Sequence, residues 1–273
     1  MLQAQSHVVN GTIYLCHTSC EILNAGTLTS YLSTVNAWVQ THPYDVVSII
    51  IENGDYVPVT EYVAPIQASG ITQFVYTPPK IPMALEDWPT LASMILSGQR
   101  VVLFMDYDAN QAQVPWILDE FSQMWETPFD PTNNSFPCTV QRPPGLSAQD
   151  APDRLYLTNH NLNEEVSLLG NSLLIPLIPL LPVTNGVSGP GSLGDAAETC
   201  YEDWGRPPNF LNVDYYNNGS GTVFEVAAKW NNVTYNRTCC GSVTSVADRT
   251  LDMVGRSVMV MASVVLSIIW LLM

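Results

Sequence analysis

Apolar residues along the chain fall into two patterns. Nearly continuous apolar runs at 46–51 and 100–105 predict strands that are buried on both faces. Apolar positions three or four residues apart predict a helix over 28–39. Similar patterns predict strands at 1–5, 12–15, 155–157 and 210–213, and helices at 62–68, 89–96, 114–124, 192–204 and 222–230.

Strand and helix patterns alternate, which indicates a parallel sheet whose crossovers are helices. Polar residues follow the strand ends, where a TIM-type (β/α)8 barrel keeps its active site. We therefore expect such a barrel, with an irregular insertion rich in Pro, Asn and Ser at 130–153. Each polar residue taken alone is also compatible with a buried group that only completes hydrogen bonds. The candidates are His17, Glu52, Asp55, Asp106, His160 and Asp214.

The chain is strongly acidic, with 25 Asp and Glu against 9 Lys and Arg and a formal net charge of −16. This charge argues against nucleic acid as a partner and against electrostatic docking on anionic lipid, because both are negative. Solubility alone is a sufficient explanation for the acidity.

Glycosylation motifs and cysteines indicate a protein exported from the cell. N-glycosylation sequons begin at Asn10, Asn133, Asn218, Asn232 and Asn236. The six cysteines form an even set that suits disulfides, although the sequence leaves their connectivity open.

Cys16 and Cys20 flank His17, and a local disulfide between them would hold the loop that carries this histidine. A zinc site built on Cys16, His17 and Cys20 is the alternative interpretation.

The chain ends in an apolar run at 258–273. This run is shorter than the roughly 20 residues that a transmembrane helix needs. A small-residue site, a polar spacer and an apolar tail together form the signal for a glycosylphosphatidylinositol (GPI) anchor. Ser245 is the expected attachment residue, with Gly241 and Ser242 as alternatives. A buried core helix is the other interpretation of the run.

Four long segments carry a resemblance to a known family. They read LQAQSHVVNGTIYLCHTSC, IIIENGD, VLFMDYDANQAQVPWILDEFSQMWETPFDP and WGRPPNFLNVDYYNNG. These segments resemble the phospholipase C-like phosphodiesterases, TIM-barrel relatives of phosphatidylinositol-specific phospholipase C, and especially their secreted fungal members. The resemblance implies acid–base cleavage of a phosphodiester in a phospholipid or glycolipid headgroup, without a cofactor.

The resemblance also implies roles for two residues. In the family, one histidine acts as general base and a second as general acid for the leaving oxygen. His17 matches the general acid. Asp214 matches the aspartate that orients the other histidine in bacterial members. His160 matches no residue with a known role.

Three further positions are compared with the family's phosphate and calcium sites. Gln5 stands where bacterial members place an arginine near the phosphate, and Gln3 and Gln5 stand near acidic ligands of the calcium-dependent animal members. Glu52 matches a third acidic position of the calcium type. Since Ca²⁺ takes about 6–8 oxygens including several carboxylates, we expect no metal here.

The family's first barrel strand, which carries the other histidine, has no counterpart in this sequence. We therefore expect a barrel that lacks its first βα unit, with a gap beside the strands at 1–5 and 210–214. We also expect this strand and a signal peptide to precede Met1 in the natural protein. The expected organisation is a barrel at 1–235, a linker and GPI spacer at 236–257, and the apolar tail at 258–273.

The sequence leaves three functions open. The first is a phosphoric diester hydrolase at the extracellular face of the plasma membrane or in the cell wall, weakened by the absent base. The second is a non-catalytic GPI-anchored surface protein that keeps the barrel. The third is a glycoside hydrolase, which needs two carboxylates about 5–10 Å apart. Asp55, Asp106 and Asp214 are candidates for those carboxylates.

The anchor signal gives a direct prediction. Full-length protein isolated from membranes should carry a GPI group near Ser245 and should be released by a bacterial phosphatidylinositol phospholipase. Mass spectrometry of the C-terminal peptide measures this. An intact peptide that continues to Met273 would rule the anchor out.

Overall fold

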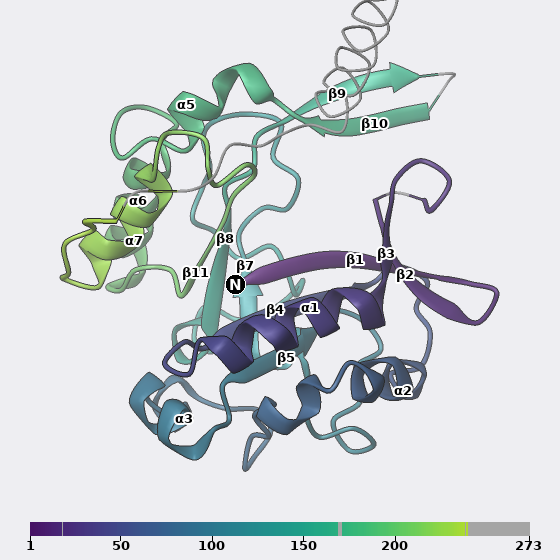
Figure 1. The fold of residues 1–273 in the computed structure, drawn as a ribbon. Coiled ribbons are helices and arrows are strands. Elements are labelled where there is room, and N and C mark those ends of the chain that lie inside the picture. Colours follow the sequence, from purple (N-terminus) through teal and green to yellow (C-terminus); the bar gives the residue numbers. More distant parts are fainter. Residues whose placement is uncertain (18, 169–170, 238, 240–273) are drawn as a thin grey trace, which may run out of the picture.

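The computed structural model describes residues 1–17, 19–168, 171–237 and 239 (Figure 1). Its strands are β1 (Leu2–Val9), β2 (Thr12–Cys16), β3 (Asn24–Thr27), β4 (Val47–Asn53), β5 (Val101–Met105), β6 (Ile117–Asp119), β7 (Met124–Glu126), β8 (Leu155–Asn159), β9 (Asn163–Leu168), β10 (Asn171–Pro176) and β11 (Phe210–Asn212). Its α-helices are α1 (Leu28–Thr41), α2 (Thr60–Ala68), α3 (Leu91–Ser97), α4 (Glu120–Gln123), α5 (Leu181–Thr184), α6 (Leu193–Trp204) and α7 (Thr222–Trp230). The fold is therefore of the mixed α/β class, as the alternation predicts.

Most strands belong to two sheets. The larger has the order β3-β2-β1-β4-β5-β6 and the smaller the order β11-β8-β7. Pairing is parallel from β1 through β4 and β5 to β6, and again from β7 through β8 to β11. The hairpins β1–β2 and β9–β10 are antiparallel.

Strands β4 and β5 are buried on both faces, as their apolar runs predict. Ile49 and Leu103 pack with Leu32 of α1 and Ile66 of α2 on the outer side. Alternate residues point to the other side, since side chains alternate along a strand. There Ile50, Phe104, Leu118, Leu157 and Phe210 form one apolar cluster. This cluster joins the two sheets, so the molecule has a shared interior between them.

A closed barrel is not seen among the described residues. The two sheets do not hydrogen-bond to each other, and β1 and β11 are not paired. The separation of β1 from β11 agrees with the expected gap, but the TIM-type barrel itself stays a prediction. Residues of both strands line one pocket, which is described below.

Most helices follow the predicted pattern. Helices α1, α6 and α7 cover the segments predicted at 28–39, 192–204 and 222–230. Ser192 caps α6 by accepting a hydrogen bond from the Asp195 N–H at 3.2 Å.

The helix predicted at 114–124 is wrong. The chain there forms β6, the single turn α4 and β7. Ile117 and Leu118 pair with Leu103 and Phe104 of β5, so the hydrogen bonds of the sheet replace those of a helix. Strand pairing across the fold thus overrides a local spacing that suits a helix.

The insertion at 130–153 is irregular, as its composition predicts, with one 3₁₀ turn at Ala151–Asp153. A disulfide from Cys138 to Cys200 fastens it to α6, with the Cα atoms 5.2 Å apart. Trp125 and Tyr156 stack beneath it with ring centroids 4.5 Å apart. The insertion is therefore held against the smaller sheet.

Cys16 and Cys20 form the expected local disulfide, with Cα atoms 4.9 Å apart. This pairing excludes the zinc alternative, because both thiols are used.

The predicted glycosylation sites lie within the described residues, and the predicted anchor does not. Asn10, Asn133, Asn232 and Asn236 are exposed and Asn218 is half-buried. Ser245 and the tail at 258–273 lie outside the described residues. Among the residues that the structure describes, no helix combines the length and apolar character needed to cross a bilayer.

Arg100 is a buried cation that closes the C-terminal end of α1. Its guanidinium donates to the backbone carbonyls of Val39 at 3.0 Å, His42 at 2.8 Å and Asp45 at 3.1 Å. These carbonyls lie in the last turn of α1 and just after it, where the backbone acceptors of a helix lack their usual intrahelical donors. Arg100 therefore ties α1 to the start of β5.

We predict that Arg100→Met lowers the free energy of unfolding by about 2–3 kcal/mol, because a charged donor is lost from buried acceptors. Urea unfolding followed by circular dichroism measures this. Lys80→Met is the matched control: Lys80 pairs with Asp87 at the surface, where an ion pair contributes about 0–1 kcal/mol. Equal midpoints for the two variants would contradict the role of Arg100.

Candidate functional site

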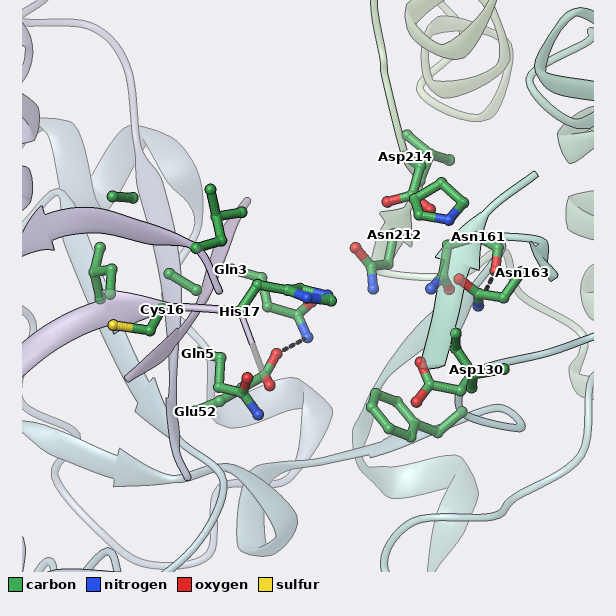
Figure 2. Close-up of a pocket in the computed structure, with 18 of the residues that line it drawn as sticks. Gln3, Gln5, Cys16, His17, Glu52, Asp130, Asn161, Asn163, Asn212 and Asp214 are labelled. Atoms are coloured by element: carbon green, nitrogen blue, oxygen red, sulfur yellow. Dashed lines mark hydrogen bonds between the residues drawn. The ribbon is translucent and has the colours of Figure 1, made fainter. Parts of the chain in front are cut away.

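A pocket of about 810 Å³ lies between β1 and β11 (Figure 2). One wall comes from the larger sheet, through the ends of β1, β2 and β4. The other wall comes from the segments after β7, β8 and β11 and from the β9–β10 hairpin. Its lining residues are Met1, Leu2, Gln3, Ala4, Gln5, Leu15, Cys16, His17, Leu23, Ala25, Glu52, Phe129, Asp130, Asn161, Asn163, Leu173, Leu174, Pro176, Asn212, Val213 and Asp214.

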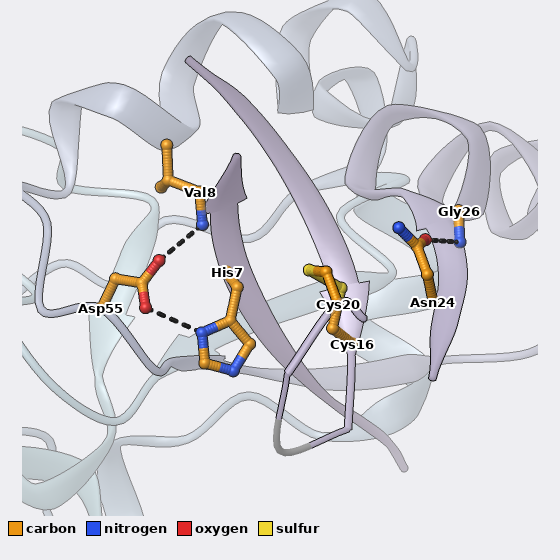
Figure 3. Close-up of a disulfide and its surroundings, with 7 residues drawn as sticks. All are labelled: His7, Val8, Cys16, Cys20, Asn24, Gly26 and Asp55. Carbon is orange, nitrogen blue, oxygen red and sulfur yellow. Dashed lines mark hydrogen bonds and ion pairs between the residues drawn. A yellow bond between two sulfur atoms is a disulfide. The ribbon is translucent and has the colours of Figure 1, made fainter. Parts of the chain in front are cut away.

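His17 follows the last residue of β2 and is the only histidine in this lining. Its backbone N–H donates to Leu23 O at 3.1 Å, and its carbonyl accepts from Ser19 N at 2.7 Å. The Cys16–Cys20 disulfide closes the same loop (Figure 3). The imidazole extends from this fixed loop toward the opposite wall (Figure 2).

Glu52 of β4 and Gln3 of β1 line the same wall of the pocket as His17. Parallel pairing of β1 with β4 sets Gln5 beside Glu52, and Gln3 Nε2 donates to Glu52 Oε1 at 2.6 Å. Burial raises the pKa of Glu52, and the hydrogen bond from Gln3 offsets this only in part. Gln3, Gln5, Glu52 and His17 thus line the same pocket.

Asp214 stands on the opposite wall, two residues after β11. Its backbone is fixed by the buried Asn185, whose side-chain amide donates to Asp214 O at 3.0 Å and Tyr215 O at 3.1 Å. Burial raises the pKa of Asp214, and the negative charge of Asp130 raises it further. Asp214 therefore shares the pocket with His17.

Asp130 is a pocket carboxylate that the sequence did not single out. It lies four residues after β7, at the start of the irregular insertion, and its backbone has a φ of 51°. Burial raises its pKa, while the positive charges of Arg142 and His17 act in the opposite direction. In the sequence, Asp130 is one polar residue at the start of a segment rich in Pro and Asn, and this is only a weak signal.

Amide side chains complete this wall. Asn212 Nδ2 donates to Asn159 Oδ1 at 3.0 Å, and Asn163 Nδ2 donates to Asn161 O at 2.9 Å. Figure 2 shows Asn161, Asn163 and Asn212 around the same opening as Asp130 and Asp214. The sequence shows these asparagines only as polar residues close to strand ends, which gives no reason to select them.

Asp106 and His160, like Asp55 below, do not line this pocket. Asp106 is buried, and its carboxylate accepts from the backbone N–H groups of Asn53 and Tyr107, both at 2.8 Å. His160 is buried, its ring contacts Phe136, and its Nε2 lies 3.0 Å from Thr184 O. Burial lowers the pKa of His160 to about 4, so the neutral form is the one that packs here. Both residues support the fold beside the pocket.

The three carboxylates that the sequence offers for a glycoside hydrolase do not converge. Asp55 lies outside the lining, where its Oδ1 pairs with His7 Nδ1 at 2.7 Å and its Oδ2 accepts from Val8 N at 2.6 Å (Figure 3). Asp106 is bonded to backbone, as described above. Of the candidates for that activity, Asp214 alone lines the pocket.

Arg142 is a second residue that sequence reasoning missed. It comes from the irregular insertion and is mostly buried beside the pocket. Its Nε and Nη2 both donate to Glu126 Oε2 at 2.9 Å, and its Nη1 donates to the Tyr107 hydroxyl at 3.3 Å. The guanidinium also lies 4.4 Å from the centroid of Phe129. Its guanidinium is therefore held in place by Glu126, and its positive charge also acts on the pKa of Asp130.

No group of three or more His, Cys, Asp or Glu side chains in the described part of the chain is arranged to hold a metal ion. Glu52 has Gln3 as its hydrogen-bond partner in the pocket.

The mutual repulsion of Asp130 and Asp214 gives a pH prediction. Asp130→Asn removes a negative charge that raises the pKa of Asp214, so the pKa of Asp214 should fall toward its ordinary value. Wild-type Asp214 accordingly keeps its proton to a higher pH than the variant does. Carboxyl ¹³C NMR titration measures this shift. Glu198→Gln, at an exposed pair with Lys229, should leave Asp214 unchanged, and an unchanged Asp214 in Asp130→Asn would refute the coupling.

Comparison with known proteins identifies a family and several relatives. A family model described as PI-PLC X 1 matches residues 1–231. An "Uncharacterized secreted protein" of Arthroderma benhamiae is 56% identical over 273 residues, covering 98% of this chain and 62% of that protein. A "PI-PLC X domain-containing protein 1" of the same organism is 38% identical over 222 residues, covering 80% and 70%. A PI-PLC X domain-containing protein of Arabidopsis thaliana is 28% identical over 231 residues, covering 81% and 50%.

The chain thus spans 62% of the first of these relatives and 50% of the Arabidopsis protein. No solved structure matches it. The family model covers the strands, the helices and both walls of the pocket, and it includes the four motifs that carry the resemblance. The chain therefore belongs to the PI-PLC X domain family.

Proposed function

We propose that this chain is a phosphoric diester hydrolase of the phosphatidylinositol phospholipase C type, acting on a phospholipid or glycolipid headgroup. The observation that carries the proposal is the position of His17. It stands at the end of β2, in a pocket whose opposite wall carries Asp130 and Asp214. A polar centre with apolar side chains at its edge, including Leu23, suits a headgroup attached to acyl chains.

His17 supplies the acid of the proposed reaction. A phosphodiester placed between the walls has its leaving oxygen near the imidazole, which donates a proton as the P–O bond breaks. The Cys16–Cys20 disulfide limits movement of the loop, and this favours catalysis because a misplacement of about 1 Å can cost about 100-fold in rate.

The proposed base is the weaker half of this mechanism. The chain has four histidines, and the other three lie elsewhere: His7 pairs with Asp55, His42 stacks on Trp38, and His160 is buried. A pocket carboxylate, Asp214 or Asp130, is then the group available to accept the proton of the headgroup hydroxyl that attacks the phosphorus as the bond to the leaving oxygen breaks. Loss of a well-matched acid–base group typically costs about 10²–10⁴ in rate, so we propose slow turnover.

A non-catalytic surface protein is the second candidate function. The observation that favours it is the absence of any Lys or Arg from the pocket lining given above. A phosphodiester carries a negative charge, and enzymes that transfer phosphoryl groups generally neutralise it with cations. In this candidate the pocket binds a headgroup without cleaving it.

We place either function outside the cell. The Cys16–Cys20 and Cys138–Cys200 disulfides suit an oxidising compartment, and one similar protein is named as secreted. A GPI anchor at Ser245, attachment to the plasma membrane or cell wall, and a barrel that ends near residue 235 remain parts of the proposal.

The test is cleavage of phosphatidylinositol vesicles by the 273-residue chain. We expect slow release of soluble inositol phosphate, cyclic form included, and a fall of about 10²–10⁴ in His17→Ala because the acid is lost. His42→Ala is the control, since His42 is exposed at the end of α1. Release that is unaffected by His17→Ala would refute the mechanism. No release from inositol, ethanolamine or glycolipid vesicles would favour the non-catalytic candidate.

A further inference from the structure

Two glutamates are in contact in the interior of the protein and do not line the pocket. Glu120 belongs to the single turn α4 and Glu126 to β7, and both side chains are fully buried. A hydrogen bond joins them when one of the two carries a proton. As carboxylates, both offer only acceptors, and their two negative charges would repel each other strongly in an interior that screens charge less than water does.

One cation compensates one of these charges. Arg142 donates from Nε and from Nη2 to Glu126 Oε2, both at 2.9 Å, and Asn159 Nδ2 donates to the same oxygen at 3.1 Å. The backbones are also paired, since the Glu126 N–H donates to Arg142 O at 2.8 Å. Glu126 is therefore the ionised member of the pair, and its charge is balanced through Oε2.

Three oxygens of the pair still lack a donor. In their ionised forms, Glu120 Oε1, Glu120 Oε2 and Glu126 Oε1 accept no hydrogen bond from the described residues. An isolated ionised carboxylate is so costly to bury that such a group takes up a proton instead. A proton on Glu120 removes its charge and gives Glu126 Oε1 the donor that it lacks.

The ionisable groups around Glu120 are mostly acidic. Burial raises the pKa of Glu120 well above its ordinary value, and Glu126 raises it further through its charge and its hydrogen bond. Asp106, which follows β5, also raises this pKa, and Arg142 lowers it. The carboxylate of Asp119, at the end of β6, accepts a hydrogen bond from a serine of α4. The single cation is thus outweighed, and Glu120 keeps its proton.

We propose that Glu120 holds a proton at neutral pH and donates it in a hydrogen bond to Glu126, and that this pair is a pH-sensitive latch on Arg142. Arg142 also donates to the Tyr107 hydroxyl at 3.3 Å, and its guanidinium lies 4.4 Å from the ring centroid of Phe129, which lines the pocket. When alkaline pH removes the proton, a second negative charge stands beside Glu126 and the latch loosens. The inference goes beyond the proposed hydrolase, because it concerns the fold and does not need catalysis.

The latch determines how the stability of the fold changes with pH. The pKa of Glu120 is higher in the folded chain than in the unfolded chain, where it takes its ordinary value. Its stabilising contribution is therefore complete below that ordinary value and is lost as the pH rises through the folded value. At neutral pH, unfolding releases the proton that Glu120 holds.

The first measurement counts the protons released on unfolding at neutral pH. Thermal unfolding of the 273-residue chain, with disulfides intact and EDTA present, is followed by calorimetry in two buffers of different ionisation heat. We expect Glu120→Gln to release about one proton fewer than wild type, so its unfolding constant should change about 10-fold less per pH unit. Glu198→Gln, which removes an exposed carboxylate paired with Lys229, should release as many protons as wild type.

A second variant separates the charge from the hydrogen bond. Glutamine is neutral and keeps a donor for Glu126 Oε1, whereas methionine is neutral and has no donor. Glu120→Gln should therefore unfold at a higher temperature than Glu120→Met, and both should release the same number of protons. Independently of any variant, the infrared spectrum of the folded wild type at neutral pH should contain the C=O stretch of a protonated carboxylic acid, and this band should disappear on unfolding.

Nuclear magnetic resonance tests the latch itself. The Nε–H signal of Arg142 should persist to a higher pH in Glu120→Gln than in wild type, because the variant has no proton to lose at this position. The Nε–H signal of Arg206, whose guanidinium donates to Asn209, should disappear at the same pH in both proteins.

Four results would each overturn the inference. They are a wild-type spectrum without the infrared band, a Glu120→Gln variant that releases as many protons as wild type, a Glu120→Gln variant that unfolds at a lower temperature than Glu120→Met, and an Arg142 signal that disappears at the same pH in wild type and in Glu120→Gln.

Discussion

The parallel pairing of β1 with β4 is the contact on which the site depends. It sets Gln5 beside Glu52 and lets Gln3 bond the Glu52 carboxylate. The Asn10–Gly11 turn then reverses the chain into β2, so His17 emerges on the same wall. A shift of one residue would turn every side chain of β1 to the opposite face. Ser6 stabilises this register, because its buried hydroxyl is hydrogen-bonded to both Glu52 O and Tyr62 Oη, each at 2.8 Å.

The wall that carries Asp130 and Asp214 is held by side-chain contacts and a disulfide and not by strand register. Its residues follow the ends of β7, β8 and β11, and none of these strands exceeds five residues. Short strands give little rigidity alone, so buried polar groups fix the connecting backbone. Asn185 holds the carbonyls of Asp214 and Tyr215, and the Cys138–Cys200 disulfide holds the insertion that begins at Asp130. Carboxylates are thereby kept in a partly desolvated place where repulsion between them would otherwise move them apart.

The two walls meet through the apolar cluster that contains Ile50, Phe104 and Phe210. This cluster, and not strand pairing, connects the sheets in the described residues. Hydrophobic contact carries no directional hydrogen bonds, so it fixes the distance between the walls less strictly than a closed ladder does. The electrostatic character of the pocket depends on this separation, since Asp214 responds to both Asp130 and His17.

Several features are determined by the sequence alone. Continuous apolar runs define β4 and β5, three-and-four spacing defines α1, α6 and α7, and four long motifs carry the resemblance to the family. These signals are local, because they report which side of an element is buried. The tertiary structure decided the rest. Strand pairing replaced the helix predicted at 114–124. Asp106 and His160 lie outside the pocket in buried hydrogen bonds, and Asp130 and Asn161 line it. Those outcomes depend on which distant segments pack together, and residue spacing along the chain carries no record of that.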